Sequence, residues 1–113
     1  MGKDWVEFSK DVDARSAALF KGNRETMRAF RQLVGEVSKD GILDQKTKEL
    51  IALGIAIAVR CEGCISFHTR AVIKHGVSRE EVLETIGVAI EMGGGPSSVF
   101  GAEVLDAFDQ LSA

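Results

Sequence analysis

Ten consecutive residues without a polar side chain, Leu50 to Val59, constrain this chain more than any other stretch. The run is only about half of the roughly 20 apolar residues that cross a bilayer as a helix. Asp44 can cap a helix that is polar as far as Glu49 and apolar on every side beyond it. Such a helix is normally buried, and a chain of 113 residues has few other helices to enclose it. We therefore expect a buried central helix and a homo-oligomer whose subunits help to cover it.

The rest of the chain also has helical periodicity, with apolar residues three or four positions apart, and no stretch alternates as a strand does. Trp5 to Leu19 and Met27 to Val37 read as two amphipathic helices, separated by Gly22-Asn23 as stop and cap. A helix from about Cys61 to Lys74 stops at His75-Gly76, where glycine supplies a left-handed residue.

Two further helices follow, each with its own start signal. Ser78 and Glu81 form a capping box for a helix that continues to Met92. Gly93-Gly94-Gly95 then breaks the chain, and Pro96 suits the first turn of a last helix to about Leu111. The pattern predicts an all-α fold, a compact bundle of about six helices in a single domain that spans residues 1–113.

Charge and composition exclude several classes of protein. Seventeen acidic and 14 basic residues give a net charge of -3, which offers no basic surface for a nucleic-acid backbone. The N-terminal residues lack the apolar core of a signal peptide. We therefore expect a cytoplasmic protein that binds neither nucleic acid nor membrane.

The only two cysteines and one of the two histidines fall within eight residues, from Cys61 to His68. On a helix that opens at Cys61, Cys64 and His68 lie at about 300° and 340° from it, so the three share a sector of about 60°. Closely spaced cysteines in a reducing compartment favour redox or metal chemistry over a structural staple. A helix N-terminus lowers a thiol pKa, and a three-residue offset allows a disulfide.

His68 is the candidate proton acceptor, and Glu49 is the candidate group that orients it. An antiparallel pair of helices would bring Glu49, twelve residues before Cys61, toward the cysteine helix. Two other interpretations stay open for the cysteines. They can be small buried hydrophobic residues, or they can hold zinc together with His68 and Glu49, although structural zinc sites usually contain a second cysteine pair.

These residues carry a family resemblance. Four features stand in order: Lys48-Glu49-Leu50, eleven residues between Glu49 and Cys61, the pattern Cys61-x-x-Cys64-x-x-x-His68, and the helix break at Gly76. Over about residues 40–100, the chain therefore resembles the alkylhydroperoxidase D-like proteins of the carboxymuconolactone decarboxylase superfamily. The resemblance implies an all-helical subunit that assembles into trimers or hexamers. We expect neither a cofactor nor a bound metal.

The resemblance also implies a reaction, the thiol-dependent reduction of a small peroxide or a disulfide. Cys64 would attack and become a sulfenic acid, Cys61 would resolve it as a disulfide, and His68 with a water would relay the thiol proton to Glu49. An electron donor, either a protein or a thiol, would restore the pair. The best-known peroxidase of the family has a histidine where this chain has Gly63, so thiol chemistry is implied more strongly than the peroxide substrate.

Two other functions stay open. The chain can be a cofactor-free lyase that acts on a carboxylated lactone, with Glu49 and His68 as acid and base and the cysteines incidental. It can also be a redox-sensing or purely structural oligomer without enzymatic activity.

Overall fold

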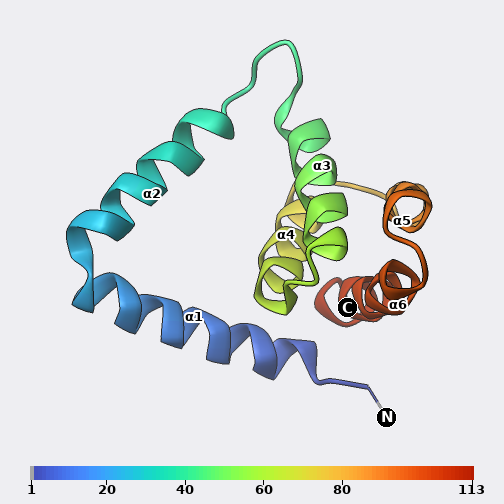
Figure 1. The fold of residues 1–113 in the computed structure, drawn as a ribbon, viewed down its shortest axis with the longest axis horizontal. Helices are drawn as coiled ribbons and strands as arrows, with labels where there is room; N and C mark the ends of the chain where they lie inside the picture. Colours follow the sequence, from blue (N-terminus) through green and yellow to red (C-terminus); the bar gives the residue numbers. More distant parts are fainter. Residues whose placement is uncertain (1) are drawn as a thin grey trace.

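The computed structural model describes residues 2–113, and over these residues the chain is all-α (Figure 1). Six helices follow one another with short connections: α1 (Trp5–Gly22), α2 (Arg24–Val37), α3 (Gln45–Ala58), α4 (Glu62–Lys74), α5 (Arg79–Gly93) and α6 (Gly95–Leu111). The predicted fold class and number of helices are confirmed. None of the six described helices has the length and hydropathy needed to span a bilayer.

Local capping signals set most of the helix ends. The Asp44 side chain accepts a hydrogen bond from the Thr47 amide at 2.8 Å and starts α3. Ser78 and Glu81 form the predicted capping box at the start of α5. Gly76, with φ of 75°, lies just beyond the end of α4, as expected of a glycine stop.

Three predicted boundaries differ in detail. Asn23 separates α1 from α2, but its side chain makes no capping hydrogen bond. Cys61 precedes α4 as its N-cap, and the helix begins at Glu62. Of the three glycines before Pro96, only Gly94 lies outside a helix, because its φ of 73° is enough to turn the chain from α5 into α6.

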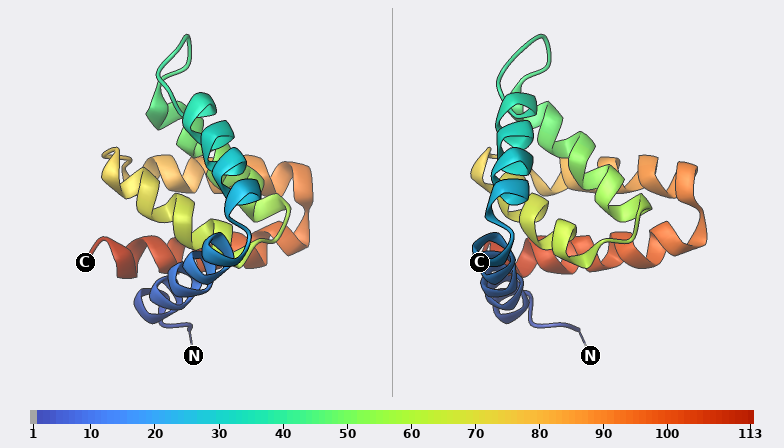
Figure 2. Two further views of the ribbon diagram at one scale, coloured as in Figure 1. Left: turned by 90° about the vertical axis from the view of Figure 1, so that its left-hand side faces the viewer. Right: turned by 60° about the vertical axis from the view of Figure 1, so that its left-hand side comes forward.

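The core lies among α3, α4, α5 and α6. α3 packs against α4 on one side and against α5 on the other, while α6 lies along α5 and also contacts α3 and α4. Figure 2 shows α5 and α6 running side by side. Fully buried side chains fill the space between these helices, among them Leu53, Ile57, Ile65, Val72, Val82 and Val104.

The N-terminal half of α1 packs against this core. Trp5 is fully buried, and its amide donates to the Gln110 side chain of α6 at 2.7 Å. The hydroxyls of Ser9 and Ser66 form a buried hydrogen bond of 2.6 Å between α1 and α4. These contacts hold α1 across the start of α4, where the cysteines lie.

α2 is different, because it packs only against α1 and buries none of its residues. It stands away from α3 and α4 in Figure 1 as an arm on the end of α1. Even so, the radius of gyration of 14.2 Å is close to the roughly 13 Å expected of a compact domain of this length.

α3 is only partly enclosed within one copy of the chain. Leu53, Ala56 and Ile57 are buried, whereas Ile51 and Ile55 remain 49% and 56% exposed. One copy of the chain therefore leaves a face of α3 uncovered, as expected from the small number of other helices available to enclose it. That other copies cover this face stays a prediction.

Candidate functional site

A residue in the left-handed region, Arg60, leads the chain out of α3 and into α4. Its φ is 60°, and the Cys61 amide donates to the Ala56 carbonyl while the Arg60 amide donates to the Ile57 carbonyl, both at 3.1 Å. This pair of hydrogen bonds is a Schellman motif, which usually has glycine at the left-handed position. The motif reverses the chain and places Cys61 directly at the N-terminus of α4.

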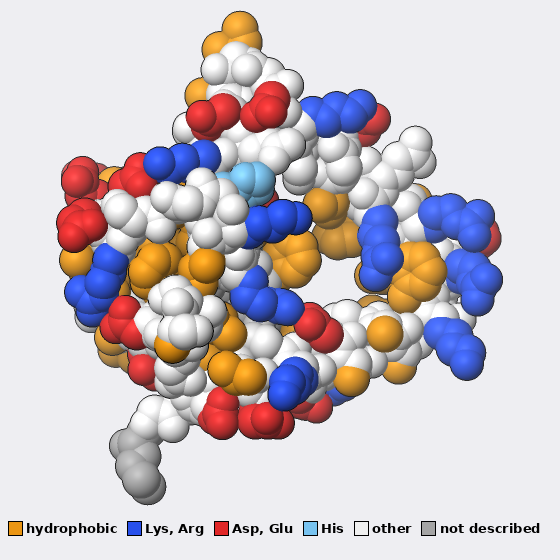
Figure 3. All heavy atoms as spheres, turned by 180° about the vertical axis from the view of Figure 1, so that it is seen from behind, with side chains coloured by type: hydrophobic (Ala, Val, Ile, Leu, Met, Phe, Trp, Pro, Cys, Tyr) orange, Lys and Arg blue, Asp and Glu red, His pale blue; other side chains and the backbone are white. Residues whose placement is uncertain are grey.

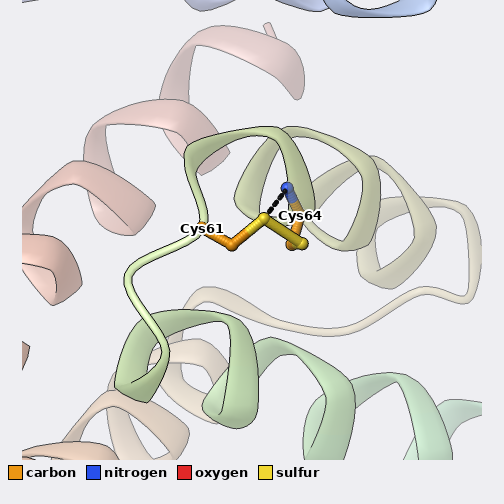
Figure 4. The surroundings of a disulfide bond; sticks show 2 residues. All are labelled: Cys61 and Cys64. Carbon is orange, nitrogen blue, oxygen red and sulfur yellow. Dashed lines mark hydrogen bonds between the residues drawn. A yellow bond between two sulfur atoms is a disulfide. The ribbon is translucent and has the colours of Figure 1, made fainter. Parts of the chain in front are cut away.

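The two cysteines form a disulfide across the first turn of α4 (Figure 4). Their Cα atoms are 5.1 Å apart, and the Cys64 amide donates to the Cys61 sulfur at 3.1 Å. Both residues are half-buried, and Cys64 packs against the hydrophobic core. A thiolate formed here would meet free amides and the positive end of the helix dipole, which stabilise negative charge.

Glu49 and His68 meet one turn farther along α4. Because α3 and α4 pack against each other, Oε2 of Glu49 lies 2.8 Å from Nδ1 of His68. The side chains are 14% and 27% exposed, so solvent screens the contact only partly. The Phe67 ring meets the imidazole edge-on, with centroids 5.1 Å apart.

The sequence-predicted site residues thus fall into two adjoining pairs. Cys61 and Cys64 are bonded to each other, Glu49 and His68 are hydrogen-bonded, and His68 follows Cys64 by four residues on the same helix. Side chains at this spacing are neighbours on one helix face. If Glu49 is ionised and accepts from Nδ1–H, the lone pair of His68 is at Nε2, where it can take a proton.

Sequence reasoning missed a charged cluster around Glu62, which lies between the cysteines. Lys3 forms an ion pair with Glu62 and also lies over the Phe8 ring, 4.1 Å from its centroid. The Lys3 hydrogen bond lowers the pKa of Glu62. On α6, burial and the hydrogen bond to the neighbouring Glu62 carboxylate raise the pKa of Glu103 above its usual 4.5. No sequence signal joins residues this far apart.

A hollow of about 500 Å³ between α1 and the start of α4 reaches the cysteine motif at Glu62 and Gly63. Phe8, Val12 and Leu19 form its apolar wall. A Cβ atom at Gly63 would lie 3.6 Å from the Val12 side chain, an ordinary contact distance. The hollow thus borders the cysteine motif at Gly63, where a small side chain would fit against its apolar wall.

The zinc interpretation finds no support in this geometry. Within residues 2–113, no three His, Cys, Asp or Glu side chains are placed to hold a metal ion together. Cys61 and Cys64 are bonded to each other, and Glu49 is directed to the imidazole.

Known proteins with the same sequence pattern and fold identify the family. The carboxymuconolactone decarboxylase family model matches residues 24–107. The structure resembles the crystal structure of an apo carboxymuconolactone decarboxylase family protein from Legionella pneumophila, with a TM-score of 0.93, 45% identity, and coverage of 96% of this chain and 97% of that one.

Two curated relatives support the same conclusion. An uncharacterised protein of Cupriavidus necator is 34% identical over 103 residues, which is 91% of each chain. An uncharacterised protein of the cox locus of Paracoccus denitrificans is 35% identical over 83 residues, 74% of this chain and 75% of that one. The chain belongs to the carboxymuconolactone decarboxylase family.

Proposed function

We propose that this protein is a thiol-dependent oxidoreductase that reduces a small peroxide or exchanges a disulfide through Cys61 and Cys64. The observation that carries the proposal is the cysteine pair in the first turn of α4 with the hydrogen-bonded Glu49 and His68 one turn away. A redox pair needs a second thiol within bonding distance and a base that takes the proton of the first. The Cys61–Cys64 pair supports the first requirement, and the position of His68, four residues after Cys64 on α4, supports the second.

With a peroxide, the reaction uses two electrons from the dithiol. The Cys64 thiol gives its proton to Nε2 of His68, while Glu49 stabilises the imidazolium through Nδ1. The thiolate attacks one peroxide oxygen, the O–O bond breaks, and the leaving alkoxide takes the proton from His68 and departs as an alcohol.

The second half of the reaction closes the disulfide. Cys64 is now a sulfenic acid, and the Cys61 sulfur attacks it, so that the S–O bond breaks and water leaves. An external dithiol or thiol-bearing protein then restores both cysteines by exchange. The Cys64 amide, which donates to the Cys61 sulfur, would stabilise Cys61 as the leaving thiolate in that step.

Peroxide consumption with a dithiol reductant tests the proposal. Cys64→Ser should abolish turnover, and His68→Gln should lower the rate by about 10²–10⁴-fold, the usual contribution of a general base. His75→Gln is the matched control, because His75 lies at the C-terminal end of α4 and should leave the rate unchanged.

Two outcomes would contradict the proposal. If Cys64→Ser retains the wild-type rate, the thiol is not the nucleophile. If the wild-type protein reduces neither a peroxide nor a small aromatic disulfide, the oxidoreductase assignment is wrong.

A lyase reaction is the second candidate, because the Glu49–His68 hydrogen bond is also a suitable acid–base pair for decarboxylation of a carboxylated lactone. In that case Cys64→Ser would retain activity on the lactone, and only substitutions of Glu49 or His68 would abolish it.

A further inference from the structure

An acidic residue shares the first turn of α4 with the two cysteines. Glu62 lies between Cys61 and Cys64 in the sequence and is the first residue of the helix. The free amides and the positive end of the helix dipole at this terminus stabilise a carboxylate as well as a thiolate. Because like charges close together destabilise each other, an ionised Glu62 opposes the formation of a thiolate on either cysteine.

Lys3 neutralises this carboxylate from the N-terminal segment of the chain. Its ammonium forms an ion pair with Glu62, and the hydrogen bond from Lys3 lowers the pKa of the Glu62 carboxyl, so Glu62 is charged at neutral pH. The Lys3 and Glu62 side chains are 28% and 41% exposed. Solvent therefore screens the pair in part, and such a pair adds little to the stability of a fold. What distinguishes it is its position beside the cysteines.

Contacts of both its backbone and its side chain hold Lys3 in this position. Gln110 on α6 accepts from the Trp5 amide at 2.7 Å and donates to the Lys3 carbonyl at 2.8 Å. The Lys3 ammonium lies 4.1 Å from the centroid of the Phe8 ring and 5.1 Å from that of Trp5, distances at which an aromatic ring attracts a cation. The Lys3 ammonium is therefore a fixed part of this site and not a freely solvated surface charge.

Other charged groups face this cluster from α6 and α1. Burial, and then the hydrogen bond to Glu62, raise the pKa of Glu103 on α6, so this carboxyl retains its proton to a higher pH than usual. Asp106, three residues farther along α6, also raises the pKa of Glu103. On α1, Arg15 borders the same hollow as Glu62, but its guanidinium is paired with Asp11 at 2.5 Å. The charge on Glu62 is therefore balanced by the N-terminal segment and not by α1 or α6.

More distant charges do not replace this ion pair. Figure 3 shows acidic and basic side chains interspersed over the helical core, whereas basic side chains gather over α2 on the right. Within the part of the chain that the structure describes, α2 makes no contact with α4. Exposed charges more than about 8–10 Å apart are largely screened at physiological ionic strength. The electrostatic potential at the cysteines therefore depends mainly on the groups at the start of α4.

We propose that Lys3, acting through Glu62, raises the reduction potential of the Cys61–Cys64 pair by cancelling the carboxylate charge at the start of α4. Reduction by glutathione moves two electrons and two protons from two glutathione thiols to the disulfide, which becomes two cysteine thiols while glutathione is oxidised. Once Glu62 is neutralised, the helix terminus can stabilise a thiolate on the reduced pair, and stabilising the reduced form raises its potential. This role of Lys3 rests on the proposed redox function of the pair and identifies what tunes it.

Equilibration with reduced and oxidised glutathione at about pH 7 measures the effect without any peroxide. Lys3→Met retains an apolar stem over the aromatic rings but loses the charge. It should lower the equilibrium constant for reduction by about 2–5-fold, the usual effect of one charge at a helix terminus. Glu62→Gln should raise the constant by a similar factor. Lys3→Arg and the double variant Lys3→Met/Glu62→Gln should both stay close to the wild type.

Lys39→Met is the matched control, because Lys39 forms an ion pair with Glu36 at 3.0 Å at the end of α2 and should leave the constant unchanged. A loss of packing would shift both single variants in the same direction, whereas a loss of charge shifts them in opposite directions. Fluorescence of Trp5, the only tryptophan, should keep its wild-type maximum in each variant, because Trp5 is fully buried.

Two results would overturn the proposal. In the first, Lys3→Met keeps the wild-type equilibrium constant. In the second, the double variant remains as low as Lys3→Met, which would show that Lys3 does not act through Glu62. A protein that shows the predicted shifts but reduces neither a peroxide nor a small disulfide would support the tuning by Lys3 and contradict the proposed function.

Discussion

The close packing of α5 against α6 makes Gly101 a sensitive test of the fold that supports the site. A Cβ atom at Gly101 would lie 2.5 Å from Cγ2 of Ile86, about 1 Å closer than carbon atoms pack. Ile86 is 7% exposed and β-branched, so it has little room to move. We expect overpacking to cost about 2–3 kcal/mol, offset by about 1 kcal/mol because alanine favours a helix over glycine. Gly101→Ala should thus destabilise the fold by about 1–2 kcal/mol, or lower Tm by about 5–10 °C.

Gly87→Ala is the matched control for this prediction. Gly87 lies in the middle of α5, and nothing is within 4 Å of the position of its Cβ atom. Without a clash, the same substitution should stabilise the protein by about 0.4–1 kcal/mol. Thermal and urea unfolding followed by circular dichroism, at one fixed protein concentration, measure both effects. The reasoning is refuted if Gly101→Ala is as stable as the wild type or if Gly87→Ala destabilises.

Two further substitutions test the electrostatics and the helix caps. The pKa of Glu103 is raised in the folded state, so the folded protein loses the favourable protonated form as pH rises through that pKa. Glu103→Gln should therefore raise Tm at pH 7 and have little effect on Tm below pH 4. An equal change in Tm at both pH values would contradict this account. Ser78→Ala removes the side chain that accepts from the Glu81 amide at 3.1 Å and should cost about 1 kcal/mol in urea unfolding, whereas an unchanged midpoint would show that the capping box contributes nothing.

Helix boundaries could be predicted from the sequence wherever a local signal determines them. Asp44, Ser78 and Gly76 each act within one turn of the helix that they start or stop. Arg60 could not be predicted, because nothing local marks a non-glycine residue as left-handed. Its φ of 60° is maintained by the packing of α3 against α4.

Long-range packing explains the other differences. The apolar run of α3 correctly predicted a central helix, but how much of it one subunit covers depends on where α2 lies, and α2 points away from it. The cluster of Lys3, Glu62 and Glu103 joins three separate parts of the chain. No local sequence pattern predicts contacts between residues this far apart in the chain.

Some residues of the candidate site could be placed together from the sequence, and one could not. Cys61, Cys64 and His68 share one helix, so helical geometry alone predicts a common face. Glu49 lies on α3, and its distance in sequence from Cys61 predicts only that it lies somewhere near α4. The 2.8 Å contact with His68 depends on the register in which α3 packs against α4, which the sequence does not determine.

The most direct test of the central claim, that Glu49 and His68 act on Cys64, is the pH dependence of Cys64 alkylation. Cys61→Ser leaves Cys64 as the single thiol and keeps a side chain that can cap α4. In this background the rate of modification by iodoacetamide should follow a thiol pKa below the ordinary value of about 8.5. Adding Glu49→Gln should move the profile to higher pH, because the imidazolium that stabilises the thiolate loses its carboxylate partner. Adding His75→Gln should leave the profile unchanged. Identical profiles with and without Glu49→Gln would contradict the account.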